Sequence, residues 1–124
     1  MTIRSYRDLT VWQQAMDLAE SCCRIAEMLP SSQRFSLVQQ IQRAAISFPS
    51  NIAEGYGRMH RRAYANHASI ARGSVLEVQT QLELAVRLGW LTREQVAEAW
   101  RATDEVSRML HSLIRKLRQP SADT

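Results

Sequence analysis

Apolar residues recur along most of the chain at alternating spacings of three and four positions, which is the pattern of one face of an α-helix. One of these stripes has seven positions without a charged residue, namely Tyr64, Ala68, Ala71, Val75, Val78, Leu82 and Ala85. It predicts a helix over about residues 60–88. Similar stripes predict three further helices over about residues 10–29, 34–55 and 93–118.

Residues that begin or end helices lie where the stripes stop. Pro30 follows the first stripe, Gly89 follows the third, and Thr92 stands at the N-cap position of the fourth. The connections are therefore short, which makes consecutive helices antiparallel. A repeat of roughly 3.5 residues favours a left-handed supercoil. We expect an all-α fold, namely an up-down-up-down left-handed four-helix bundle.

The length of 124 residues is sufficient for one domain with its own core. We assign residues 1–119 to a single bundle and residues 120–124, which begin at Pro120, to a polar C-terminal tail. No apolar run approaches the roughly 20 residues of a membrane span, and no signal peptide precedes the first helix. We expect a cytoplasmic protein with no membrane partner.

The second predicted helix contains Pro49, although a proline inside a helix removes a backbone hydrogen bond at a cost of roughly 3 kcal/mol. Apolar residues continue past it at helical spacing, so we expect a kinked helix and not a break. Ser47, Ser50 and Asn51 are candidates to satisfy the freed backbone groups. We expect Gly55 and Gly57 to adopt positive φ and to end the helix.

The segment around this proline, PSNIAEGYGR at residues 49–58, resembles the central motif of the four-helix-bundle family encoded in intervening sequences of bacterial large-subunit rRNA genes. Three segments match the family in the same order: DLTVWQQA at 8–15, QIQRAAIS at 40–47 and IARGSVLE at 70–77. Relatives include the accessory variability determinant of diversity-generating retroelements. The resemblance implies a small helical protein, commonly a ring-like homo-oligomer of five subunits, for which nucleic-acid binding is suspected and enzymatic activity is not.

Polar residues lie close to the stripes near the proline. Asn51 and Glu54 are three positions apart and share a helix face, while Arg72, Ser74 and Glu77 lie beside the stripe of the third helix. One interpretation is a ligand pocket near the kink. The other is a hydrogen-bonded network that fixes the helix register, with one of the two glutamates paired to Arg43 or Arg72.

Basic residues are the main functional signal. Sixteen basic residues, fifteen of them arginine, stand against twelve acidic ones, which gives a net charge of +4. Residues 55–76 contain no acid but include Arg58, Arg61, Arg62 and Arg72, whose spacing predicts a roughly 100° arc beside the apolar stripe. This arc either contacts nucleic acid or forms a solvated face or an inter-subunit strip. No motif for sequence-specific readout is present.

A second basic group occurs near the end of the fourth predicted helix. Its members are Arg108, Arg115, Lys116 and Arg118. Cations at a helix C-terminus interact favourably with the helix dipole, so we interpret this group as structural.

No convincing catalytic or metal-binding constellation is present. His60, His67 and His111 are distributed over two predicted helices without a partner at metal-ligand spacing. Cys22 and Cys23 are adjacent, which is unsuited to an ordinary disulfide, and we interpret them as buried or half-buried thiols. We expect no catalytic residue, no metal ion and no cofactor.

Apolar residues also lie beside the main stripes of the first and fourth helices. They are Val11, Leu18, Ile25, Trp100, Met109 and Ile114. Regular apolar stripes of this kind usually meet a partner, so we expect a homo-oligomer, with a pentamer favoured by the resemblance alone.

Two functional hypotheses remain open. The first is a non-enzymatic, homo-oligomeric helical bundle that binds RNA or DNA backbone nonspecifically, for example as an accessory to a nucleic-acid enzyme such as a reverse transcriptase. The second is a protein-interaction scaffold, without a nucleic-acid ligand, whose basic face meets an acidic protein partner.

Overall fold

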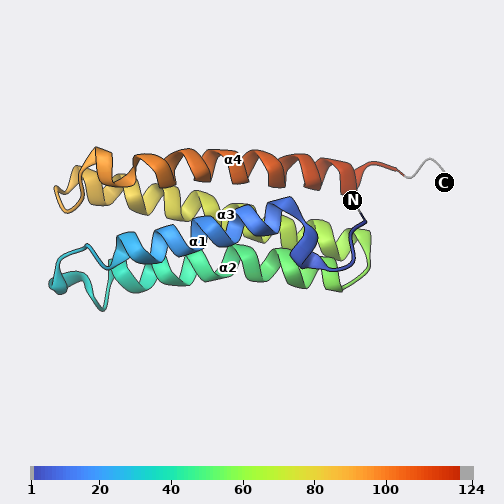
Figure 1. Ribbon diagram of the computed structural model, residues 1–124, viewed down its shortest axis with the longest axis horizontal. Coiled ribbons are helices and arrows are strands. Elements are labelled where there is room, and N and C mark those ends of the chain that lie inside the picture. Colours follow the sequence, from blue (N-terminus) through green and yellow to red (C-terminus); the bar gives the residue numbers. More distant parts are fainter. Residues whose placement is uncertain (1, 121–124) are drawn as a thin grey trace.

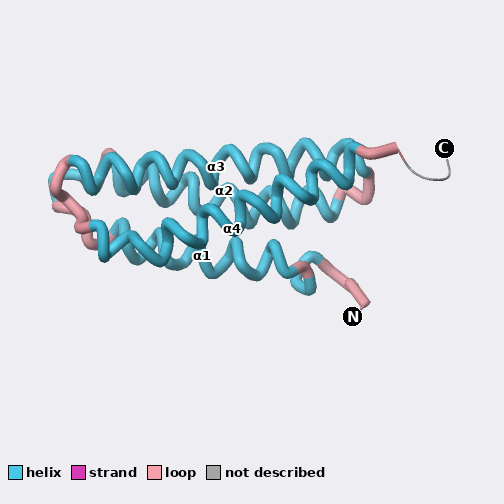
Figure 2. Tube along the Cα trace, turned by 90° about the horizontal axis from the view of Figure 1, so that it is seen from above, coloured by secondary structure: helices cyan, strands magenta, loops and turns pink. Residues whose placement is uncertain are grey.

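The computed structural model describes residues 2–120 and consists of long helices joined by short turns. The elements are η1 Tyr6–Asp8, α1 Thr10–Ala26, η2 Ser31–Gln33, α2 Leu37–Gly57, α3 Arg61–Arg87 and α4 Arg93–Arg118. The four α-helices lie side by side along one axis, and their connections alternate between the two ends (Figures 1 and 2). Within the described residues there is no strand, so the predicted all-α class with four helices is confirmed.

The predicted helix boundaries are close to those observed, because the residues that set them act locally. The Thr92 hydroxyl accepts a hydrogen bond from the Gln95 backbone N–H at 3.1 Å, and the Gln95 side-chain oxygen accepts one from the Thr92 N–H at 2.8 Å. Gly89 has a φ of 77° in the turn after α3. Both boundary predictions are therefore confirmed. Pro120 is exposed, and the rest of the predicted tail lies outside the described residues.

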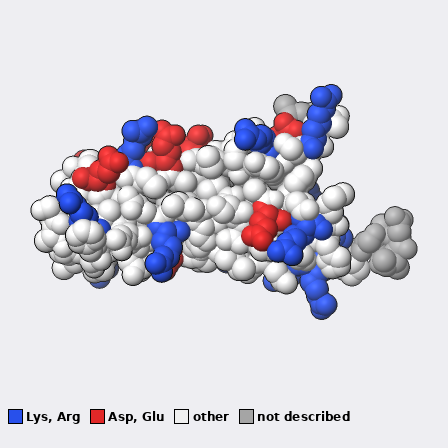
Figure 3. Space-filling model, turned by 90° about the horizontal axis from the view of Figure 1, so that it is seen from below, with Lys and Arg blue, Asp and Glu red and all other residues white. Residues whose placement is uncertain are grey.

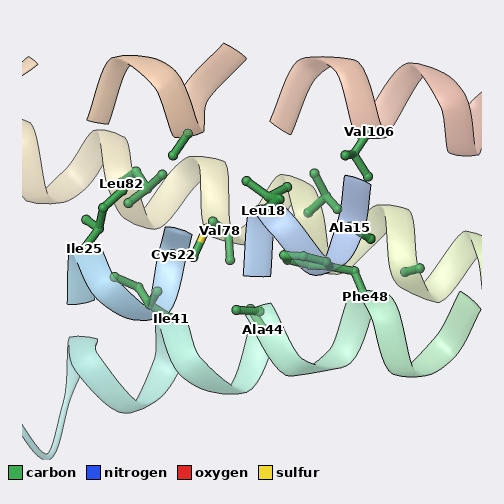
Figure 4. Packing of buried hydrophobic residues seen from close by; sticks show 14 of the residues in the cluster. Ala15, Leu18, Cys22, Ile25, Ile41, Ala44, Phe48, Val78, Leu82 and Val106 are labelled. Atoms are coloured by element: carbon green, nitrogen blue, oxygen red, sulfur yellow. The ribbon is translucent and has the colours of Figure 1, made fainter. Parts of the chain in front are cut away.

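One contiguous core runs between the four helices (Figure 4). Leu18 of α1, Ile41 and Phe48 of α2, and Leu82 of α3 are almost completely buried in it. Full burial of one such side chain contributes roughly 2 kcal/mol to the hydrophobic driving force. The core therefore accounts for the mutual packing of all four helices.

The apolar residues expected to need a partner subunit are instead covered within the single chain. Leu18 is 1% exposed, while Val11, Ile25 and Ile114 are also buried. Trp100 and Met109 are partly buried against the same core. The argument for self-association from these positions is therefore wrong, because α1 packs against both α2 and α4 and needs a wider apolar face than one stripe supplies. The left-handed supercoil and the ring-like assembly stay predictions.

The segment around Pro49 is helical throughout, as predicted, but its glycines act differently from the expectation. Gly55 and Gly57 both lie inside α2, and neither has positive φ. The positive φ near this turn, 55°, belongs to Met59. A Cβ on Gly55 would lie 2.8 Å from the Cβ of His67. Gly55 is therefore required for the close approach of α3, and the prediction that it ends the helix is wrong.

Candidate nucleic-acid interface

A network of polar side chains connects α2 to α3 close to the proline. The Asn51 amide nitrogen donates to the Ser47 carbonyl at 2.9 Å and to the Ser47 hydroxyl at 3.1 Å. The Asn51 oxygen thus faces Nδ1 of His67, 2.9 Å away, and accepts its proton. Ser74 donates to the Ser47 hydroxyl at 2.8 Å. These contacts fix the register of two antiparallel helices, which supports the structural interpretation of Asn51 and Ser74.

The charged residues predicted to join this network are arranged differently. Glu54 forms an ion pair at 3.0 Å with Arg58, the residue directly after its own helix, and not with Arg72. The hydrogen bond from Arg58 lowers the pKa of the Glu54 carboxyl below its ordinary value, and the electrostatic interaction with His67 lowers it further. Glu77 is exposed and makes no hydrogen bond or ion pair with a described residue. The predicted pairing of one of these glutamates with Arg43 or Arg72 is therefore wrong. Ser50, although adjacent to the proline, is exposed.

The four arginines of the predicted arc do not form one uniform face. Arg58 follows α2 and is held by Glu54. Arg61 at the start of α3 reaches across to the end of α4, where its guanidinium donates to the Lys116 carbonyl at 2.7 Å. Arg61 therefore satisfies a carbonyl that the helix end leaves unpaired. Arg62 and Arg72 remain as candidates for contact with a ligand.

A groove lies between the first half of α3 and the last half of α4. Its volume is about 760 Å³, and its walls combine Arg72 of α3 with His111, Arg115 and Arg118 of α4. Nε of Arg72 is buried and has no hydrogen-bond partner among the described residues. A buried, unpaired guanidinium nitrogen is costly, and Arg72 is at the same time one of the residues that line the groove.

A second hollow adjoins the groove toward the end of the bundle. Its volume is about 500 Å³, and it is lined by Arg61, Arg62 and Arg118, and thus shares Arg118 with the groove. We call Arg62, Arg72, Arg115 and Arg118 the groove arginines. None of the four lies within ion-pair distance of a carboxylate in residues 2–120.

The opposite end of the bundle has a different charge arrangement. There Glu83 forms ion pairs with Arg93 at 2.6 Å and with Arg87 at 3.1 Å. These two arginines lower the pKa of Glu83 to about 2. The hydrogen bond from Arg93 makes the largest contribution, and the hydrogen bond from Arg87 makes the next largest. On the side turned away from α4, acidic side chains also lie next to basic ones at several places (Figure 3). The arginines of this ion-pair cluster are thus neutralised by a carboxylate, whereas the groove arginines are not.

Arg115 and Arg118 are the residues whose role the sequence interpretation missed. They were attributed to the dipole of α4, whereas the fold brings them opposite Arg72. The signal was available, because residues 55–76 and 106–120 both lack acids and belong to consecutive antiparallel helices. The two basic groups therefore form one surface. Arg108 of the same group is exposed but does not line the groove.

The remaining titratable side chains give little support for other chemistry. No group of three metal-ligating side chains comes together in residues 2–120. Burial raises the pKa of the Cys22 thiol to about 12, with the neighbouring Cys23 adding to the shift, so Cys22 is a weak nucleophile. Both cysteines are free. No described helix has the length and apolar character to cross a membrane.

The fold and this surface define a small four-helix protein with an arginine-lined groove at one end. The chain matches the model of the 23S rRNA-intervening sequence protein family over residues 7–112, and it belongs to that family. The resemblance inferred from the four sequence segments is therefore confirmed. No curated protein matches the chain.

A solved structure supports the same conclusion. The chain is similar to a protein of unknown function from the S23 ribosomal protein family of Bacteroides thetaiotaomicron VPI-5482, with 27% sequence identity and a TM-score of 0.79. The similarity covers 86% of this chain and 99% of the other. It shows that the four-helix fold is shared over nearly the whole length of the relative.

Proposed function

We propose that this protein is a non-enzymatic, homo-oligomeric helical bundle that binds the backbone of RNA or DNA without sequence specificity. The observation that carries the proposal is the α3–α4 groove together with the second hollow beside it. The four groove arginines, from two helices, line these two hollows without a carboxylate partner in residues 2–120. Arginine is suited to this role because its planar guanidinium binds phosphate through two parallel hydrogen bonds.

Backbone contact, and not base readout, fits the shape of the surface. The groove is walled by two antiparallel helices of the bundle, and no helix projects from the described fold as a recognition helix would. Phosphate contacts set position and affinity but carry no sequence information. The proposed role is therefore that of an accessory to an enzyme acting on nucleic acid, such as a reverse transcriptase, with the chemistry supplied by that enzyme.

Copurification tests the proposal. Protein prepared at low salt is expected to carry nucleic acid, visible as a raised ratio of absorbance at the nucleic-acid maximum to that at the protein maximum. The ratio is expected to fall after a high-salt wash, because salt competes for the phosphate contacts. Protein that is free of nucleic acid at low salt and does not bind added oligonucleotide would contradict the proposal and favour the protein-scaffold hypothesis.

Self-association is part of the proposal and now rests on a different surface. Leu84 and Leu88 are each about half exposed and lie four positions apart on one outer face at the end of α3, and the half-exposed Ile70 lies on the same face nearer its start, with the exposed Glu77 between them. Exposed apolar side chains on one face favour contact with a second copy. We propose that up-down-up-down left-handed bundles associate through this face into a ring, with five subunits indicated only by the family resemblance.

Light scattering tests this assembly. The parent protein is expected to have a mass several times the 14.2 kDa of one chain at micromolar concentration. Leu84→Glu is expected to reduce the mass, because it places a charge within the apolar face. Ala97→Glu serves as the control, because it adds the same charge at an exposed position of α4. A parent mass equal to one chain would contradict the assembly.

A further inference from the structure

The end of the bundle next to the arginine groove contains an aromatic hollow of about 530 Å³. Tyr56 and Tyr64 line it together with Met59 and Leu117, and Arg4 and Arg61 contribute positive charge. The two tyrosine rings meet edge to face with their centroids 6.1 Å apart. This arrangement leaves an open apolar site beside cationic groups at the surface.

Met59 is an unusual component of this hollow. Its side chain is 92% exposed, and its φ of 55° lies in a region that non-glycine residues rarely adopt. An exposed apolar side chain on a strained turn gains nothing from the core of the isolated chain. It is, however, well placed to contact an apolar group that enters the hollow.

The aromatic hollow adjoins the basic surface. It shares His60, Arg61 and Leu117 with the second hollow, and the second hollow shares Arg118 with the α3–α4 groove. The groove arginines and the tyrosines therefore line neighbouring hollows, so a chain-like anion that follows these hollows would meet both. Alternation of phosphate-binding arginines with an aromatic platform is the arrangement that proteins use for single-stranded nucleic acid.

We propose that the aromatic hollow takes an unpaired base, so that the preferred ligand of this surface is single-stranded nucleic acid. This inference rests on the proposed backbone binding. It specifies in addition that the bound nucleic acid is single-stranded and not duplex. In a duplex the bases are stacked and paired inside the helix, and exposing one requires it to be flipped out. A single strand presents its bases without that requirement, and every base has a face that stacks on an aromatic ring.

The test measures equilibrium binding of a labelled oligonucleotide of about 16 nucleotides as a single strand and as the matching duplex. The parent is expected to bind the single strand more tightly at equal salt. Tyr56→Ala is expected to weaken single-strand binding by about 5- to 150-fold, the range that corresponds to loss of one base–aromatic stack, and to leave duplex binding unchanged. Tyr56→Phe keeps the ring and is expected to bind as the parent does.

A second variant guards against a folding defect in Tyr56→Ala. Met59→Gly removes the exposed apolar wall while a glycine accepts the positive φ without strain, so the fold is retained. It is also expected to weaken binding of the single strand selectively.

The outcomes separate this inference from the proposed function. If folded Tyr56→Ala and Met59→Gly bind the single strand as tightly as the parent, the inference is overturned while backbone binding stands. Equal affinity of the parent for the single strand and for the duplex would also overturn the inference and leave backbone binding standing. If the parent binds neither form, both the inference and the proposed function fail.

Discussion

Replacing Gly55 by alanine is expected to destabilise the protein by about 1–3 kcal/mol, although alanine is the better helix former. The added Cβ would lie 2.8 Å from the Cβ of His67 and 3.0 Å from a ring carbon of Tyr64. The backbone carbonyl of Tyr64 is only 3.3 Å away. A Cβ and a carbonyl cannot rotate aside, so α2 and α3 must separate. Thermal unfolding is expected to show a loss of roughly 4 °C per kcal/mol.

Gly57→Ala is the matched control. Gly57 lies in the same helix two positions later, but no atom lies within 4 Å of the Cβ it would gain. Alanine at this position is expected to stabilise the protein by about 0.5–1 kcal/mol, because it reduces the conformational freedom of the unfolded chain. If Gly55→Ala raised the melting temperature as Gly57→Ala does, the close approach of the two helices would be refuted.

Replacing all four groove arginines by alanine is expected to weaken nucleic-acid binding on the order of a thousandfold at 0.1 M salt, because four phosphate contacts are lost. Arg62, Arg115 and Arg118 are exposed, and their guanidinium groups make no hydrogen bond or ion pair with a described residue, so the folded state is expected to tolerate their replacement. Arg72 is half-buried, and its replacement also removes a buried nitrogen that lacks a partner. Helical content by circular dichroism is expected to be unchanged.

A control with the same change in net charge distinguishes a specific surface from overall attraction. Arg24, Arg87, Arg93 and Arg101 lie toward the other end of the bundle, and the first three are paired with glutamates. Replacing these four by alanine is expected to weaken binding far less, because exposed charges farther than about 10 Å from the ligand are screened at 0.1 M salt. Equal losses in the two quadruple variants would show that only net charge matters.

The four helices were predictable from the sequence because their signals are local. The Thr92 cap, the Gly89 turn and the apolar stripes each depend on residues a few positions apart. The core was predicted less completely. Leu18 and Ile25 were assigned to a partner subunit because a single stripe describes contact with one neighbour, whereas α1 is covered from two sides.

The candidate site was predictable only in part because its geometry depends on residues far apart in sequence. Arg72 and Arg62 were named from the acid-free segment, and both line the basic surface. The partner of Arg61 is 55 positions away, so its role at the end of α4 could not be inferred from spacing. Gly55 was misinterpreted for the same reason, since only the packed structure shows how closely α3 approaches.

The most direct test of the central claim is the salt dependence of oligonucleotide affinity, measured for the parent and the groove-arginine variant together. For duplex DNA each phosphate contact contributes about 0.9 to the slope of log affinity against log salt, so four lost contacts are expected to reduce its magnitude by about 3 to 4. The affinity of the parent is expected to fall steeply with salt and to depend little on sequence. A folded quadruple variant with the affinity and slope of the parent, or a parent that does not bind at low salt, would contradict the claim.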